Sequence, residues 1–209
     1  MNEIVVNGHG KHYVHGGNDF HPDRGEAPGF IVLVTADGTV RRVAEGIAFP
    51  NGITVTPGNS TLIITESFAG TLSTSDIGSD GGLSNRRVCA AVPGDRICLD
   101  TEGVWTHGFT DDGPASRRVA EGGGVLDSIP LDPAGFACML AGPDGRTLFM
   151  VAVDWRIQVS FEDNIERLTA GPKTGQLLTA RAPAPPAGHP RASGSAQAST
   201  KRLPELRFG

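Results

Sequence analysis

The sequence lacks several features that mark common protein classes. Its three cysteines form no Cys-x-x-Cys pair, which argues against a zinc–thiolate site. Acidic residues number 23 against 18 Lys and Arg, a net charge of −5, so we expect no nucleic-acid partner. No apolar run reaches about 18 residues, and no basic segment followed by an apolar core opens the chain, so neither a membrane span nor a secretory signal is expected. These absences predict a cytoplasmic protein with reduced thiols and no membrane partner.

Glycine and proline, by contrast, are abundant, with 29 and 15 residues. Helical periodicity is scarce, and short runs rich in Val, Ile, Leu, Thr and Phe alternate with turn residues, which is typical of an all-β chain. The predicted strands are Ile4–Val6, His12–Val14, Ile31–Thr35, Val40–Ala44, Ile53–Thr56, Thr61–Thr65, Thr71–Ser75, Arg87–Ala90, Ile97–Leu99, Val104–Thr106, Arg118–Ala120, Val125–Ile129, Ala137–Leu140, Thr147–Val151 and Gln176–Ala180.

A repeat organises these strands. Asn2, Asn51 and Asp95 each begin a similar stretch of apolar run, glycine-bearing turn and second apolar run, and Ala137 begins a fourth; the starts lie 49, 44 and 42 residues apart. That period fits one four-stranded propeller blade. Because blades surround a central channel, the oxygen-bearing side chains of Asn2, Asn51 and Asp95 are expected to converge there. The alternative interpretation is that such residues only satisfy backbone groups in turns.

A second echo supports the repeat, since Arg-Arg-Val occurs at Arg41, Arg86 and Arg117, each time where we expect the next inner strand to follow. The partial propeller is predicted to cover residues 1–182. Residues 183–209, rich in Pro, Ala and Ser, are predicted to be a disordered tail. Trp155–Ala170 is predicted to be either a long loop or a short helix.

Four sequence motifs carry a family resemblance. They are Phe-Pro-Asn-Gly from Phe49, Ser-Asn-Arg-Arg-Val from Ser84, Ile-Cys-Leu-Asp from Ile97 and Gly-Pro-Asp-Gly-Arg-Thr-Leu-Phe from Gly142. In this order the chain resembles the senescence-marker-protein/gluconolactonase/regucalcin-like family. The resemblance implies a six-bladed β-propeller, of which about four blades are expected here. It also implies a lactonase-type hydrolase that uses calcium or zinc.

The resemblance also implies site residues. Asn51 takes the position of a metal-binding asparagine, and Asp95 that of a metal-binding aspartate that is also the proposed general base. Asn2 takes the position of an asparagine that contacts the lactone or ester substrate. Relative to the family's domain, the chain is expected to begin near the second or third blade and to lack the metal-binding glutamate. Arg96 stands where the family has a turn glycine.

Two functions therefore stay open at this point. One is a metal-dependent hydrolase that opens a sugar lactone or related cyclic ester by water attack. The other is an inactive propeller remnant or binding module, with self-association through its open edges. Asp76 and Asp100 are interpreted as structural turn residues. Glu66 follows a strand and either faces the channel or, as the preferred interpretation, is a solvated strand end.

Overall fold

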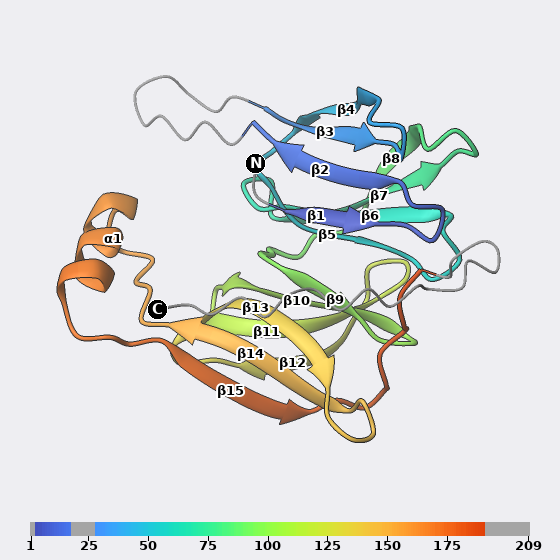
Figure 1. The fold of residues 1–209 in the computed structure, drawn as a ribbon. Helices are drawn as coiled ribbons and strands as arrows, with labels where there is room; N and C mark the ends of the chain where they lie inside the picture. The colour runs from blue at the N-terminus through green and yellow to red at the C-terminus, as the bar shows by residue number, and fades with distance from the viewer. Residues whose placement is uncertain (1–2, 18–27, 191–209) are drawn as a thin grey trace, which may run out of the picture.

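The computed structural model describes residues 3–17 and 28–190, which form four antiparallel sheets (Figure 1). Blade 1 contains β1 (Ile4–Val6), β2 (His12–Gly16), β3 (Gly29–Val34) and β4 (Val40–Ile47). Blade 2 contains β5 (Pro50–Val55), β6 (Thr61–Glu66), β7 (Thr71–Ile77) and β8 (Leu83–Ala90). Blade 3 contains β9 (Ile97–Leu99), β10 (Gly103–Thr110), β11 (Gly113–Ala120) and β12 (Val125–Pro130). Blade 4 contains β13 (Ala134–Ala141), β14 (Thr147–Val153) and β15 (Gln176–Arg181). Every strand predicted from the sequence overlaps one of the strands of the four blades.

The sheets are the blades of a β-propeller. Each begins with an inner strand and continues outward in chain order, and the inner strands β1, β5, β9 and β13 contact one another in succession. A separate apolar core fills each junction: Tyr13 and Leu33 lie between blades 1 and 2, Leu72 and Val119 between blades 2 and 3, and Trp105 with other residues between blades 3 and 4. The repeat predicted from the sequence is therefore confirmed as a blade-by-blade architecture.

The two ends of this arc leave apolar sheet faces exposed. On blade 1, Val6 and Val40 belong to one cross-strand row, joined through His12 and Val34, on the face turned away from blade 2, and Val40 is 61% exposed. On blade 4, Val151 pairs with Leu177, which is 66% exposed, on the face turned away from blade 3. Because each inner junction buries the equivalent positions, these faces are the ones on which a further layer would pack.

Trp155–Ala170, for which loop and helix were both open, contains the helix α1 (Phe161–Ala170). Ser160 caps it, since its hydroxyl accepts a hydrogen bond from the Asp163 amide at 3.0 Å. The buried Asn164 side chain donates to the backbone carbonyls of Arg156 and Val159, which anchors the preceding loop to the helix. None of the described helices is long and apolar enough to cross a membrane.

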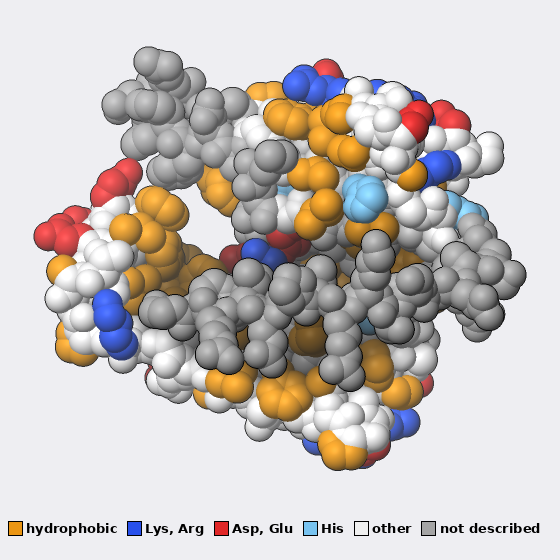
Figure 2. Space-filling view, in the orientation of Figure 1, with side chains coloured by type: hydrophobic (Ala, Val, Ile, Leu, Met, Phe, Trp, Pro, Cys, Tyr) orange, Lys and Arg blue, Asp and Glu red, His pale blue; other side chains and the backbone are white. Residues whose placement is uncertain are grey.

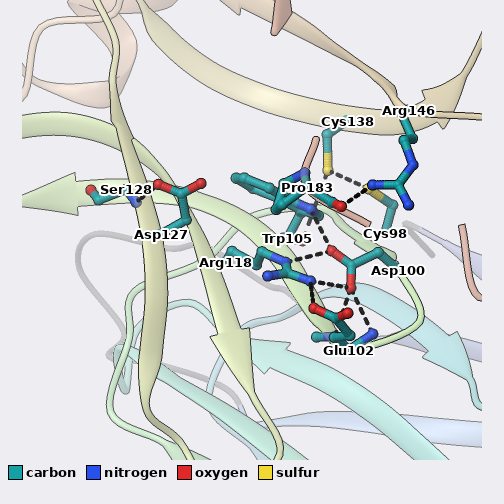
Figure 3. A network of polar contacts seen from close by, with 11 residues as sticks. Cys98, Asp100, Glu102, Trp105, Arg118, Asp127, Ser128, Cys138, Arg146 and Pro183 are labelled. Carbon is teal, nitrogen blue, oxygen red and sulfur yellow. Dashed lines mark hydrogen bonds and ion pairs between the residues drawn. The ribbon is translucent and has the colours of Figure 1, made fainter. Parts of the chain in front are cut away.

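Asp100 is a structural residue at the end of β9, as its position predicted (Figure 3). Its carboxylate accepts hydrogen bonds from the amides of Glu102 and Gly103, each at 2.8 Å, and from the Trp105 indole at 3.0 Å. Arg118 of β11 forms a two-point ion pair with the same carboxylate, at 2.6 and 3.0 Å. The pair ties the inner strand of blade 3 to its third strand.

The three thiols are free. The sulfur atoms of Cys98 in β9 and Cys138 in β13 lie 3.2 Å apart, between blades 3 and 4 (Figure 3). The first residues of the predicted tail also pack against this region: the Pro185 carbonyl accepts from the Thr101 amide, and Ala184 is buried. Residues 183–190 are therefore ordered, which differs from the predicted disorder. Their composition offers few apolar side chains to bury, but backbone hydrogen bonds to the end of β9 hold them in place. The rest of the predicted tail, 191–209, lies outside the described residues.

Candidate active site

The structure brings Asn51 and Asp95 together. Asn51 lies in β5 and Asp95 lies two residues before β9, so both stand at the same end of neighbouring inner strands. The Asn51 side chain lies beside the Asp95 carboxylate, whose pKa burial raises and Asn51 helps to lower, and its amide also approaches the Ser67 hydroxyl at 3.4 Å. Asn2, the third residue predicted to converge here, lies outside the described residues.

Backbone contacts fix the segment that carries Asp95. The Asp95 carbonyl accepts from the Thr65 hydroxyl at 2.8 Å and from the Gly52 amide at 3.1 Å. The Ser67 hydroxyl donates to the Gly94 carbonyl at 2.7 Å. A Cβ at Gly52 would lie 2.5 Å from the Asp95 carbonyl oxygen, so a glycine after Asn51 is needed for this close approach.

Glu3 joins three blades at the site. One oxygen of its carboxylate accepts from the Ile53 amide at 3.0 Å, and the other forms an ion pair with the Arg96 guanidinium. Its side chain is largely buried, whereas that of Arg96 is half-exposed. Arg96 therefore places a positive charge beside Asp95 and Glu3.

Burial controls the protonation of these carboxyl groups. It raises the pKa of Asp95 to about 6; the charge of Arg96 opposes this shift and the charge of Glu3 adds to it. Burial also raises the pKa of Glu3, again against the opposing charge of Arg96. A carboxyl group with a raised pKa accepts a proton more readily than an ordinary aspartate, which is the property a general base needs.

A recurring contact supports the site from the second strand of each blade. His15 of β2 contacts the backbone of Asn51 in blade 2, and Thr65 of β6 binds the carbonyl of Asp95 in blade 3. His107 of β10 packs beside Gly135 at the start of blade 4, and its own carbonyl accepts from the Asp95 amide at 2.7 Å. Burial lowers the pKa of both histidines to about 4, so both are neutral at pH 7.

Glu66 differs from the sequence prediction of a solvated strand end. It is 7% exposed, and its carboxylate accepts from the Ser73 hydroxyl at 2.6 Å and from the Ala48 amide at 3.0 Å. The prediction was wrong because Glu66 ends β6 beside the buried Asn51 segment, and these two donors replace water around the carboxylate.

A cavity of about 720 Å³ lies between blades 2 and 3, at the other end of the inner strands. Its lining includes Pro57 and Thr101, which follow the ends of β5 and β9, whereas Asn51 and Asp95 stand at the starts of these strands. Two of its charged lining residues are already paired, Arg87 with Asp76 and Glu102 with Arg118. The cavity is therefore separate from the Asn51–Asp95 site.

Solved structures share this architecture. A luciferin-regenerating enzyme matches with a TM-score of 0.71 and 18% identity over 92% of this chain and 65% of that one. The calcium-binding protein regucalcin from Agrobacterium tumefaciens matches with a TM-score of 0.63 and 17% identity, over 91% and 63%. A gluconolactonase from Xanthomonas campestris matches with a TM-score of 0.57 and 22% identity, over 71% and 52%. The chain thus spans less than two thirds of the length of these proteins, and the likeness shows the fold.

The sequence profile of the SMP-30/gluconolactonase/LRE-like region matches residues 1–154. The chain belongs to this family. No curated protein sequence matches it. The matched range contains Asn51 and Asp95. It also contains Arg96, which forms the ion pair with Glu3.

Proposed function

We propose that the protein is a metal-dependent hydrolase that opens a sugar lactone or a related cyclic ester by water attack. The observation that carries the proposal is the contact between the Asn51 amide and the Asp95 carboxylate, which brings the two family site positions together at the ends of β5 and β9. Family membership and the lactonase-type neighbours support the same reaction class.

The donor chemistry of this pair fits a divalent cation, calcium or zinc. An amide oxygen and a carboxylate are ligands that hard cations prefer, and the fixed backbone around Asp95 keeps the two side chains together. Within residues 3–17 and 28–190 no group of three or more His, Cys, Asp or Glu could hold a metal ion. The proposal therefore depends on two protein donors, Asn51 and Asp95, with the other positions around the cation left to water or substrate. When bound, the cation would polarise the ester carbonyl of the substrate.

In this mechanism Asp95 takes the proton of the attacking water. The oxygen of that water forms a bond to the carbonyl carbon, and the ring C–O bond then breaks to give the hydroxy acid. Asn51 orients the Asp95 carboxylate, while Thr65 and Ser67 hold its backbone in place. The predicted substrate contact of Asn2 stays a prediction.

Metal addition and lactone hydrolysis test this function together. Saturating Ca²⁺ or Zn²⁺ should raise the melting temperature by about 5–10 °C, because a ligand that binds only the folded state stabilises it by about 3 kcal/mol at a hundredfold excess over Kd. Hydrolysis of δ-gluconolactone, followed by acid release, should require the same ion. The Asn51→Ala variant should lose the thermal shift. An unchanged melting temperature together with no metal-dependent hydrolysis would remove the proposal.

A second candidate function is a non-catalytic binding module that associates with itself. The exposed apolar faces of blades 1 and 4 favour it, because a monomer seldom leaves such faces open. We expect the molar mass measured by light scattering to rise with concentration. Leu177→Asp on the open face should reduce this association, whereas Gln176→Asp, the same charge at the adjacent position, should leave it unchanged. A constant monomer mass would exclude self-association.

We also propose a cytoplasmic location, which the three free thiols support.

A further inference from the structure

An aromatic pair borders the Asn51–Asp95 site on the blade 2 side. The rings of Phe49 and Phe68 stack with centroids 4.2 Å apart. Phe49 lies two residues before Asn51, and its carbonyl accepts from the amide of Ser67, the residue that binds the Gly94 carbonyl. Phe68 is 43% exposed, so the pair presents apolar surface next to the polar side chains.

An aromatic triad lies at the same end of blade 4. The Trp155 ring contacts Phe136 with centroids 5.6 Å apart and Phe161 at 5.5 Å, both edge to face. Phe136 follows Gly135, which packs against His107, and the His107 carbonyl holds the Asp95 amide. The triad is therefore connected to the site through two adjoining contacts.

Apolar side chains border a hollow in the molecular surface (Figure 2). Figure 2 shows a hollow between the upper and lower halves of the molecule, with hydrophobic side chains beside it and acidic and basic side chains at its base. On α1 and the loop before it, Ile157, Phe161 and Ile165 are 60%, 49% and 41% exposed. An apolar group seated here would cover surface that water now contacts.

The polar groups beside the site are largely engaged by the protein itself. The hydroxyls of Thr65 and Ser67 donate to backbone carbonyls, and Arg96 is paired with Glu3. A sugar ring needs hydrogen-bond partners for several hydroxyl groups, whereas an aryl or aliphatic ring needs apolar contact. The lining therefore matches a hydrophobic substrate better than a polyol.

Resting on the hydrolase function proposed above, we propose that the substrate is a lactone or ester that carries an aromatic or bulky aliphatic ring. The ring would sit between the Phe49–Phe68 pair and the Phe136–Trp155–Phe161 triad, while the carbonyl carbon faces Asp95. Water attack on this carbonyl breaks the ring or ester C–O bond, and the leaving oxygen receives the proton that Asp95 took from water.

The test compares 3,4-dihydrocoumarin, an aryl lactone, with δ-gluconolactone on the metal-supplemented full chain. We expect kcat/KM to be at least about tenfold higher for dihydrocoumarin, since burying one aromatic ring is worth that factor or more. Phe68→Ser and Phe161→Ser should each raise KM for dihydrocoumarin about tenfold and lower the ratio of kcat/KM for dihydrocoumarin to that for δ-gluconolactone by about the same factor. Val125→Ser, which removes an exposed apolar side chain from β12, is the matched control and should change neither rate.

The outcomes separate this inference from the hydrolase function. Equal or faster hydrolysis of δ-gluconolactone, or a substrate ratio that neither phenylalanine variant alters, would overturn the substrate class and leave the hydrolase. If neither lactone is hydrolysed, binding is measured instead by titration with 2-tetralone, a ketone that has the shape of dihydrocoumarin and cannot be hydrolysed. This measurement then decides whether the apolar site exists. Binding that Phe161→Ser abolishes would keep the apolar site and reject the hydrolase, and absence of binding would overturn both.

Discussion

Asp100→Asn should lower the free energy of unfolding by about 3–5 kcal/mol, because it removes the buried counter-charge of the Arg118 guanidinium and leaves that group paired only with the exposed Glu102 carboxylate. The Asp100 side chain is fully buried, and that of Arg118 is 6% exposed. Five hydrogen bonds reach this one carboxylate, from two turn amides, the Trp105 indole and the guanidinium. An amide keeps the shape of the carboxylate but presents an N–H group where it has to accept a bond.

Asp76→Asn is the matched control. Asp76 forms an ion pair of similar length with Arg87, 2.8 Å, but both side chains are about half-exposed, so its loss should destabilise the fold far less than the loss of Asp100. Urea unfolding of the two variants and the parent gives the comparison directly. Equal destabilisation by the two substitutions would show that the Asp100 network contributes no more than a surface pair.

The same network fixes a pH dependence. Despite its burial, the hydrogen bonds and charge of Arg118 hold the pKa of Asp100 below its usual value of 3.8. Because the folded-state pKa is depressed, the contribution of this group is complete above the unfolded value and is lost as the pH falls below about 4 through the folded value. The stability difference between Asp100→Asn and the parent should therefore narrow at low pH.

Much of this architecture follows from local sequence signals. The strand β3 is a continuous apolar run after Gly29, so the sequence predicts the strand, whereas its alternation of buried and partly exposed residues becomes visible only in the fold. The spacing of Asn51 and Asp95 predicted that they lie together, and they do, although their metal-binding role stays a prediction. Both residues stand at the same position of a repeated unit, so their meeting depends only on the repeat.

Contacts between unlike positions could not be predicted in this way. Arg-Arg-Val was read as a repeat echo before each inner strand; at Arg41 and Arg86 it lies on the outer strands β4 and β8 that precede β5 and β9. At Arg117 the reading was wrong, because this copy lies on the third strand, β11, where Arg118 faces the buried Asp100. The same tripeptide therefore lies on an exposed outer strand in two copies and contributes to a buried ion pair in the third.

The Glu3–Arg96 ion pair shows the same limit at the site. The two residues are 93 positions apart in the sequence, and neither belongs to a spacing motif that would pair them. Glu3 precedes β1 of blade 1, and Arg96 precedes β9 of blade 3. The two residues come into contact only because the inner strands of blades 1, 2 and 3 pack side by side. The sequence showed Arg96 as a departure from the family pattern, but the partner of its charge became visible only in the fold.

Asp95→Asn should reduce lactone hydrolysis by about 10²–10⁴-fold, the usual contribution of a general base. The substitution is expected to leave the local fold intact, since Thr65 and Gly52 bind the backbone carbonyl of residue 95 and not its side chain. It also removes a partly buried carboxylate, so stability should not fall. The loss of rate should therefore appear in kcat while circular dichroism and the melting temperature without metal stay close to those of the parent.

Asp111→Asn is the control for the change in charge, because Asp111 is an exposed residue in the turn between β10 and β11. It should keep the full rate. Substantial hydrolysis by Asp95→Asn would exclude Asp95 as the base and favour Glu3, the carboxylate whose charge acts on Asp95, in its place. In that case Glu3 would first have to be released from Arg96, so Arg96→Gly, which restores the family's glycine, should accelerate the reaction. If Asp95 is the base, that same substitution should not rescue Asp95→Asn, because the surviving amide cannot take a proton from water.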